Sequence, residues 1–351
     1  MDLEFSRKTE EFISEIYQEL PLEGKISSVK AKRLAGGYHN RVFLLVLNTI
    51  SNKKFRSVLK LYDVRKFPYK GKAEFEALKY LKNERLGPKV YYFNPKSSLF
   101  KAPVILEEFI KGQTLGNLGF ITEKQFKHIV DLMAKIHSNT FKKYGILPAA
   151  KKGTHLDFLR DQMDRSIKAF YGGYLENLKN APPRIAGLKS KVEVHIKTCR
   201  KILSSYKNYF SGEVFCLTHG DFGLFHLVTS KGKMMILDWE SSKSADPVAE
   251  IAYFFNRAKL SSRLKDKFLK LYDKQTDLVN ESFLKRLEFY AVWDYLGDML
   301  WSLERASIQP SGELKNYYLQ DSLEILKTQQ SYKEILFERL SLLETGLNNY
   351  K

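Results

Sequence analysis

Two acidic residues are placed so that their carboxylates could have two different roles in one reaction. Asp221 lies in the segment LTHGDF, directly after a short apolar run, and Asp238 lies in MMILDWE, after a second one. At the end of a strand, one carboxylate can accept a hydroxyl proton while the other holds a hard cation through oxygen. A single Asp at such a place more often caps a turn. The pair, with His219-Gly220 before one member and Trp239 after the other, favours the catalytic interpretation.

Lys60 is a charged residue inside the otherwise apolar run RSVLKLY. A lysine is rarely buried without an anionic partner, and Glu74 in the following segment is a candidate. A Lys held by a Glu and directed at phosphates recurs in phosphoryl transfer, although an isolated strand lysine more often faces solvent. Gly36 and Gly37, with Asn40, could form a turn whose backbone approaches phosphates, but two glycines usually only make a turn.

The elements that must position these residues follow from the hydrophobic pattern. An amphipathic helix is predicted over residues 8–20, and short β-branched and aromatic runs up to about residue 110 predict an antiparallel sheet with one inserted helix. From residue 112 onward the pattern is helical, except for two strands that flank Asp221 and precede Asp238. We therefore predict an α+β fold with a β-rich lobe over residues 1–110 and a mainly helical lobe over residues 111–351.

Charge is distributed unevenly. The chain has 58 Lys and Arg against 40 Asp and Glu, a net charge of +18, and residues 25–101 hold 19 of these cations but only 4 of the acids. Such a step indicates two domains, and the basic surplus could attract a polyanion such as RNA, although no RNA-binding motif accompanies it.

The two cysteines, Cys199 and Cys216, exclude a disulfide framework and a zinc cluster. The acidic start and the short apolar runs predict a soluble, cytoplasmic protein without membrane contact.

Taken in order, these motifs resemble the aminoglycoside phosphotransferase and choline kinase-like family over residues 28–257. The segments that carry the resemblance are GGYHN, LK, EFEALKYL, VILEEFIKGQTL, MAKIHS, THGDFGLFH, ILDWE and ADPVAEIAYF, of which THGD and ILDWE are the most specific. The resemblance implies a bilobal protein-kinase-like fold. It also implies transfer of the γ-phosphate of ATP or GTP to a hydroxyl of a small molecule, with Mg²⁺ as cofactor.

The resemblance also assigns roles to individual residues. Asp221 would be the catalytic aspartate, Asp238 the principal metal ligand and Asp246 a structural acid that holds the catalytic segment. Lys60 and Glu74 would form the pair over the nucleotide phosphates. The edge of the adenine or guanine base would be received by a hinge around three residues, Glu107, Glu108 and Phe109.

One position departs from the family pattern. The family usually shows HGDxxxxN, where the Asn contacts a second magnesium ion, but here the fifth residue after Asp221 is His226. Imidazole is a poorer ligand for Mg²⁺ than an amide oxygen and a better one for Mn²⁺, so His226 is a metal-ligand candidate and Mn²⁺ an alternative cofactor. Macrolide kinases of this family use His here, and the Lys, Glu and both Asp are present. A catalytically impaired nucleotide-binding pseudokinase is therefore the less favoured alternative.

Acidic residues in the helical part are candidates for binding the phosphate acceptor. Three of them share one helix face at i, i+4, i+7 spacing, although such a face is more often only solvated: Asp157, Asp161 and Asp164. A second pair lies among aromatic residues: Asp294 and Asp298, with Trp293, Tyr295 and Trp301. Acids beside aromatics suit an amine, which favours an amino-sugar, macrolide or amino-alcohol acceptor. An RNA acceptor, or RNA docked on the basic lobe, is the second hypothesis, and the sequence does not indicate an oligomeric state.

Overall fold

The structure is a computed structural model that describes residues 3–34, 40–63, 68–118, 120–174, 181, 183–307, 322–348 and 350. Its chain forms two compact units. The first comprises Met1–Leu132, Ile146–Pro148 and His219–Lys243, and the second comprises Met133–Gly145, Ala149–Thr218 and Ser244–Lys351. The α+β class predicted from the sequence is confirmed, and the division at residue 110 stays a prediction.

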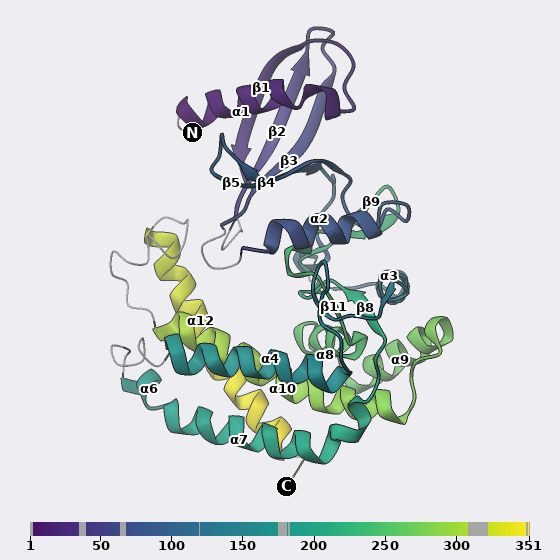
Figure 1. Ribbon diagram of the computed structural model, residues 1–351, viewed down its shortest axis with the longest axis vertical. Coiled ribbons are helices and arrows are strands. Elements are labelled where there is room, and N and C mark those ends of the chain that lie inside the picture. The colour runs from purple at the N-terminus through teal and green to yellow at the C-terminus, as the bar shows by residue number, and fades with distance from the viewer. Residues whose placement is uncertain are drawn as a thin grey trace. The chain divides into compact units, whose positions relative to one another are not determined.

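A five-stranded antiparallel sheet with the order β1-β2-β3-β5-β4 dominates the first unit (Figure 1). Its strands are β1 (Ile26–Arg33), β2 (Arg41–Thr49), β3 (Lys54–Leu61), β4 (Val90–Ser97) and β5 (Ala102–Glu108). Helix α1 (Leu3–Glu15) and the 3₁₀ turn η1 (Tyr17–Glu19) precede the sheet, close to the helix expected over residues 8–20.

Side chains alternate between the two faces of this sheet because successive residues of a strand point in opposite directions. One face carries buried Phe43, Leu45 and Leu47 of β2, which pack in a single core with Phe12 and Ile13 of α1. This explains why the first helix is amphipathic: its apolar stripe covers the sheet.

The opposite face of the sheet carries Lys60. In the strand register Lys60 pairs with Val42 of β2 and with Ile105 of β5. Glu107 follows Ile105 by two residues and therefore projects from the same face. Burial of Lys60 on this face requires compensating anions.

The rest of the first unit lies outside the sheet. It contains α2 (Lys70–Tyr80), the 3₁₀ turn η2 (Leu115–Asn117), the hairpin of β9 (Leu227–Ser230) and β10 (Lys233–Ile236), and the 3₁₀ turn η5 (Trp239–Ser241). Helix α2 packs against β4, β5 and η5. The Ser242 hydroxyl donates to the Ala73 carbonyl at 2.9 Å and fixes the end of η5 on α2.

The chain passes from the first unit to the second within α3 (Glu123–His137). The second unit is mainly helical, with α4 (His155–Ala169), the π-helical turn η3 (Phe170–Tyr174), α6 (Pro183–Ala186), α7 (Lys189–Tyr206), the 3₁₀ turn η4 (Lys207–Phe210), α8 (Pro247–Arg257), α9 (Ser262–Thr276), α10 (Glu281–Ser307) and α12 (Ser322–Asn348). Short strands β6 (Thr140–Phe141) and β8 (Phe215–Thr218) pair within it. Two more, β7 (Gly145–Ile146) and β11 (Lys243–Ala245), lie at positions where one unit passes into the other.

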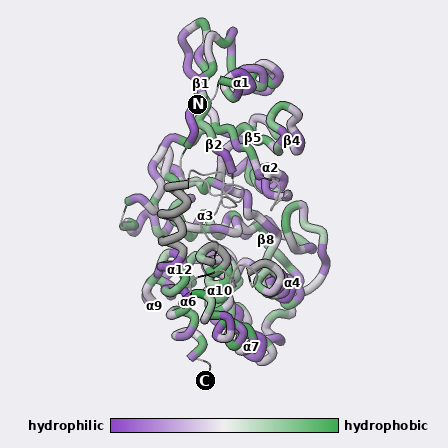
Figure 2. Tube along the Cα trace, turned by 90° about the vertical axis from the view of Figure 1, so that its left-hand side faces the viewer, coloured by the Kyte–Doolittle hydropathy of each residue, from purple (hydrophilic) through white to green (hydrophobic). Residues whose placement is uncertain are grey.

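Helix α10 is the centre of the second unit, since it packs against α7, α8 and α12. Hydrophobic and hydrophilic residues alternate along α7, as expected for a helix with one buried side (Figure 2). Among the residues that the structure describes, no helix is long and apolar enough to cross a membrane.

Candidate active site

Three carboxylates surround the ammonium group of Lys60. Its Nζ atom lies 2.5 Å from Oε1 of Glu74, 3.1 Å from Oε1 of Glu107 and 3.6 Å from Oδ1 of Asp238. Burial alone would lower the pKa of Lys60, but the three surrounding carboxylates raise it well above its usual range. An ammonium group has three donors, so each N–H of Lys60 can face one carboxylate. The ion pair expected between Lys60 and Glu74 is therefore present, within a larger cluster.

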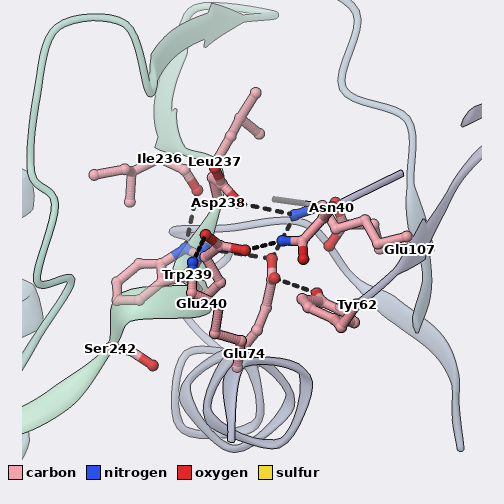
Figure 3. Close-up of polar contacts among 12 residues, drawn as sticks. Asn40, Tyr62, Glu74, Glu107, Ile236, Leu237, Asp238, Trp239, Glu240 and Ser242 are labelled. Carbon is pink, nitrogen blue, oxygen red and sulfur yellow. Dashed lines mark hydrogen bonds and ion pairs between the residues drawn. The ribbon is translucent and has the colours of Figure 1, made fainter. Parts of the chain in front are cut away.

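Glu74 is the most firmly held of the three acids. Figure 3 shows it rising from α2 between Tyr62 and Trp239. Its Oε2 atom accepts the hydroxyl of Tyr62, and its Oε1 atom also accepts the backbone N–H of Trp239 at 3.3 Å. Burial and the charge of Glu74 raise the pKa of Tyr62, so this hydroxyl remains a donor. Tyr62 is thus a positioning residue that the sequence pattern did not reveal.

Asp238 begins the turn η5 in the left-handed conformation, with φ 67° and ψ 62°. Asp and Asn tolerate this conformation better than most residues, because their short polar side chains can form local hydrogen bonds. Desolvation would raise the pKa of Asp238, but the positive charge of Lys60 holds it below its usual range. The side chain of Asp238 is 42% exposed, so it is accessible to a ligand.

Asp221 and His226 lie at the two ends of one short loop, and their side chains meet. His226 Nε2 is 3.3 Å from Asp221 Oδ2, and the Asp221 side chain is 46% exposed. Burial would lower the pKa of His226, but the hydrogen bond with Asp221 and the charge of Asp238 raise it. Gly220 before Asp221 has φ +79°, and a Cβ there would lie 2.1 Å from the Ser241 carbonyl oxygen, so this turn requires glycine.

Glu240 joins three segments of the first unit and was not anticipated from the sequence. It accepts hydrogen bonds from the side-chain nitrogens of Asn40 and Lys70. The Asn40 amide oxygen accepts the backbone N–H of Asp63 at 3.4 Å. Burial, reinforced by the charge of Asp238, raises the pKa of Glu240 to about 7. Asn40, predicted to belong to a phosphate-binding turn, is therefore tied to the loop that carries Asp238.

Lys60 contacts only one of the two carboxylate oxygens of Glu107. Glu107 is 3% exposed, and its Oε2 atom has no hydrogen-bond partner among the described residues. Burial raises the pKa of Glu107 to about 8, and although Lys60 opposes this, the charge of Glu74 adds to it. The folded protein therefore holds this proton more tightly than the unfolded chain does.

Replacing Glu107 by Gln should change how stability depends on pH. Because the folded pKa of about 8 lies above the ordinary 4.5, the contribution of Glu107 is present at low pH and is lost as pH rises toward 8. We expect the advantage of Glu107→Gln over wild type to grow with pH in this window, by up to about 1.4 kcal/mol per pH unit. Urea denaturation at several pH values measures it, with Glu108→Gln as the control. Parallel curves for Glu107→Gln and wild type would contradict the pKa assignment.

Comparison with protein-family models decides which family this arrangement belongs to. The model of the phosphotransferase enzyme family matches residues 30–283, which include the Lys60 cluster, the Asp221 loop and α8. The chain belongs to the phosphotransferase enzyme family. It is a nucleotide-dependent phosphotransferase with an alcohol group as acceptor. A search of curated proteins finds no significant match.

Solved structures show the same fold. The choline kinase LicA from Streptococcus pneumoniae is 16% identical, with a TM-score of 0.60 and 98% of this chain and 100% of that chain covered. A choline kinase from Cryptosporidium parvum Iowa II is 17% identical, with a TM-score of 0.58 and 97% of both chains covered. A thermostable mutant of aminoglycoside phosphotransferase APH(4)-Ia, in a ternary complex with ADP and hygromycin B, is 14% identical, with a TM-score of 0.59 and 97% of both chains covered. The predicted protein-kinase-like fold is thereby confirmed.

The structure describes some, but not all, of the other residues that were predicted to bind nucleotide. Gly36 and Gly37 lie outside the described residues. Glu108 ends β5, and its Oε2 atom accepts the backbone N–H of Lys89 at 3.3 Å, whereas Phe109 is half-buried. Glu107 directs its side chain to Lys60, a contact that the expected hinge did not include. The roles of these residues toward a base stay predictions.

Asp246 is completely buried in the second unit of the phosphotransferase. Its Oδ1 atom accepts the backbone N–H of Val248 at the start of α8, at 3.1 Å. Its Oδ2 atom lies 2.9 Å from Arg286 Nε and 3.5 Å from His155 Nδ1. These contacts join α4, α8 and α10, which is a structural arrangement.

The acidic stripe of α4 has protein partners. Asp157 forms a capping box with Thr154 at the helix start, which lowers the pKa of Asp157. Asp161 is 2.5 Å from Lys151 Nζ and accepts the Tyr144 hydroxyl at 3.0 Å. Asp164, 73% exposed, lies 3.6 Å from Arg200. The helix-start signal around Asp157 could have been read from the sequence, because Thr followed three residues later by an acid marks a cap.

The second acidic group, on α10, also has partners. Asp294 accepts the Asn256 side-chain amide at 2.9 Å, and Asp298 pairs with Arg257 and Arg339. The two tryptophans differ in burial: Trp293 is 8% exposed and Trp301 is 38% exposed. The predicted role of this group in binding an acceptor remains a prediction, but its carboxylates face guanidinium and amide donors.

Proposed function

We propose that this protein transfers the γ-phosphate of ATP or GTP to a hydroxyl group of a small molecule, with Asp221 as the catalytic base. The observation that carries this proposal is the grouping, within one compact unit, of the Lys60 cluster and the Asp221–His226 pair. A charged lysine over phosphates, a carboxylate for a cation and a carboxylate for the acceptor hydroxyl are the parts that phosphoryl transfer requires.

Lys60 is positioned to bind nucleotide phosphates. Tyr62 and the Trp239 backbone hold Glu74, and Glu74 in turn holds the lysine ammonium. Asp238 is the most distant and most exposed of the three carboxylates around Lys60. A phosphate oxygen can therefore take the place of Asp238 on Lys60 without disturbing Glu74.

The residues present fit a hard divalent cation. Among the described residues, no group of three or more His, Cys, Asp or Glu could hold a metal by itself. Mg²⁺ usually takes only one or two protein carboxylates and completes its coordination with phosphate oxygens and water, so Asp238 suffices as the main protein ligand. When bound, Mg²⁺ or Mn²⁺ would neutralise charge on the phosphates. His226 is the candidate second ligand.

Asp221 is placed to accept the proton of the acceptor. As the acceptor oxygen forms its bond to the γ-phosphorus and the bond to the bridging oxygen breaks, the hydroxyl proton passes to the Asp221 carboxylate. The displaced nucleoside diphosphate leaves with the bridging oxygen. The contact of His226 with Oδ2 limits rotation of this carboxylate.

Replacing His226 by Asn should preserve or raise Mg²⁺-dependent turnover, because an amide oxygen suits Mg²⁺ better than imidazole does. Turnover with Mg²⁺ and with Mn²⁺ should be compared for both proteins, and we expect the Mg²⁺/Mn²⁺ ratio to increase in the variant. Complete loss of activity in a folded His226→Asn protein would show that the imidazole has another role.

The acceptor class is tested with labelled nucleotide. Labelled ATP or GTP is incubated with amino-sugars, macrolides and amino-alcohols, which the sequence favours, and with bulk tRNA. Label in any small molecule, absent from an Asp221→Asn control, supports the proposal. No labelled product from any acceptor, combined with tight nucleotide binding, would favour the pseudokinase.

One observation keeps an RNA acceptor as the second candidate. The strands β1, β2 and β3 contain no acidic residue, and four exposed cations lie on the face that carries Lys60: Lys30, Lys32, Lys54 and Arg56. Binding of RNA to such a surface would weaken steeply with salt. Label found only in RNA would replace the first candidate by this one.

A further inference from the structure

The helices α8, α10 and α12 of the second unit carry a group of charged side chains that takes no part in the proposed transfer of the phosphate. Asp298 of α10 pairs with the guanidinium groups of Arg257 on α8 and Arg339 on α12, the latter with Nε at 3.3 Å from Oδ2. The guanidinium carbon of Arg257 lies 4.7 Å from the Tyr253 ring centre, and that of Arg339 lies 6.0 Å from the Tyr295 ring centre. Both arginines are therefore held in defined orientations.

Several donors in this group have nothing to bind. Arg339 is 6% exposed and Ser302 is fully buried, yet Arg339 Nη1 and Ser302 Oγ have no hydrogen-bond partner among the described residues. The same holds for Nε of Arg257. Ser302 follows Asp298 by one helical turn, so it projects from the same side of α10. Unpartnered buried donors are rare in folded proteins and usually indicate a ligand or an ordered water.

The chemistry of the unpartnered groups indicates the ligand class. The two guanidinium groups share the carboxylate of Asp298. Glu338 lies nearby, and the hydrogen bond from Lys259, followed by the charges of both arginines, lowers its pKa. Asp294 also lies near the group: burial and the charge of Asp298 raise its pKa to about 7, and the charge of Arg257 opposes this rise. All of the unpartnered groups named above are hydrogen-bond donors. The planar fork of N–H groups on an arginine matches the oxygens of a carboxylate or phosphate.

We propose that Arg257, Ser302 and Arg339 form a binding site for a small oxyanion, a carboxylate or phosphate group. The site lies within the second unit and uses none of the residues assigned to nucleotide chemistry, so anion binding to it can be measured independently of the proposed function. Its occupant is either an anionic group of the acceptor itself or a separate anionic effector.

The direct test measures anion binding without turnover. Wild type, Arg339→Lys and Ser302→Ala are titrated with inorganic phosphate and with succinate, against sodium chloride at equal ionic strength, by calorimetry and by thermal denaturation. Arg339→Lys keeps the charge beside Asp298 but loses the free donor. Ser302→Ala removes a hydroxyl that has no partner, so it should not destabilise the unliganded protein. We expect about tenfold weaker anion binding in each variant.

Lys259→Gln is the matched control. Lys259 follows the end of α8, is 66% exposed and pairs with Glu338 of α12, so this variant loses one positive charge but no donor of the site. Phosphate that binds at the nucleotide site is common to all four proteins and cancels in the comparison. Equal anion binding in wild type, Ser302→Ala and Arg339→Lys would overturn the proposal and assign the free donors to water. If Arg339→Lys does not fold, Ser302→Ala decides alone.

Kinetics separate the two sources of the anion. With an acceptor found by the labelling screen, an increased KM for the acceptor in Arg339→Lys, with the nucleotide KM unchanged, identifies the occupant as part of the acceptor. A change in kcat on adding phosphate or succinate, absent from Arg339→Lys, identifies a separate effector. Kinetics of Arg339→Lys that equal wild type in both respects, together with unchanged anion binding, would refute the site.

Discussion

Asp221→Asn should abolish phosphoryl transfer while nucleotide affinity stays within about twofold of wild type, because Asp221 acts on the acceptor hydroxyl. The substitution keeps the shape of the side chain and an oxygen that can still accept from His226, which lies 3.3 Å away, but removes the base. General-base catalysis contributes roughly 10²- to 10⁴-fold, so turnover should fall by about that factor or more.

The measurement pairs initial rates on a verified acceptor with nucleotide titration of the same preparation. Asp266→Asn is the control, because that residue is exposed on α9 and lies outside the unit that holds Asp221. Near-normal turnover of Asp221→Asn would show that another group receives the proton.

Asp238→Asn should weaken nucleotide binding in the presence of Mg²⁺ far more than in its absence. The side chain loses the negative charge that would hold the cation, whereas the Lys60–Glu74 pair that faces the phosphates is unchanged. Asn is the appropriate replacement because it tolerates the left-handed backbone at this position, so a loss of binding would not reflect a distorted turn. Turnover should fall together with binding.

Titrations of nucleotide with Mg²⁺ and with EDTA give the metal-dependent part of the affinity directly. In wild type the two titrations should differ by at least about tenfold, and in Asp238→Asn they should nearly coincide. Glu23→Gln serves as the control, since it removes an exposed carboxylate of the same unit outside the Lys60 cluster. A full metal effect in Asp238→Asn would assign the cation to other ligands.

The sequence alone determined the local elements and the residues that face each other through regular geometry. The alternation of apolar residues in β2 and the stripe of α1 define a sheet with one covered face, and Lys60 on the other face demands an anion. Glu74 could be named as its partner because the next helix along the chain packs beside the sheet. The motif order was enough to predict the family, which the family model confirms.

Only the tertiary structure decided which further groups complete these sites. Glu107 approaches Lys60 because the strand order of the sheet places β5 beside β3, and sequence periodicity does not specify which strands become neighbours. Glu240 bonds Asn40 across 200 residues and Trp239 donates to Glu74 across 165. The sequence pattern predicts no arginine partner for Asp298 on α10, but in the structure Asp298 pairs with one arginine of α8 and one of α12. Contacts between distant segments depend on how whole elements pack, and local patterns carry no information about that packing.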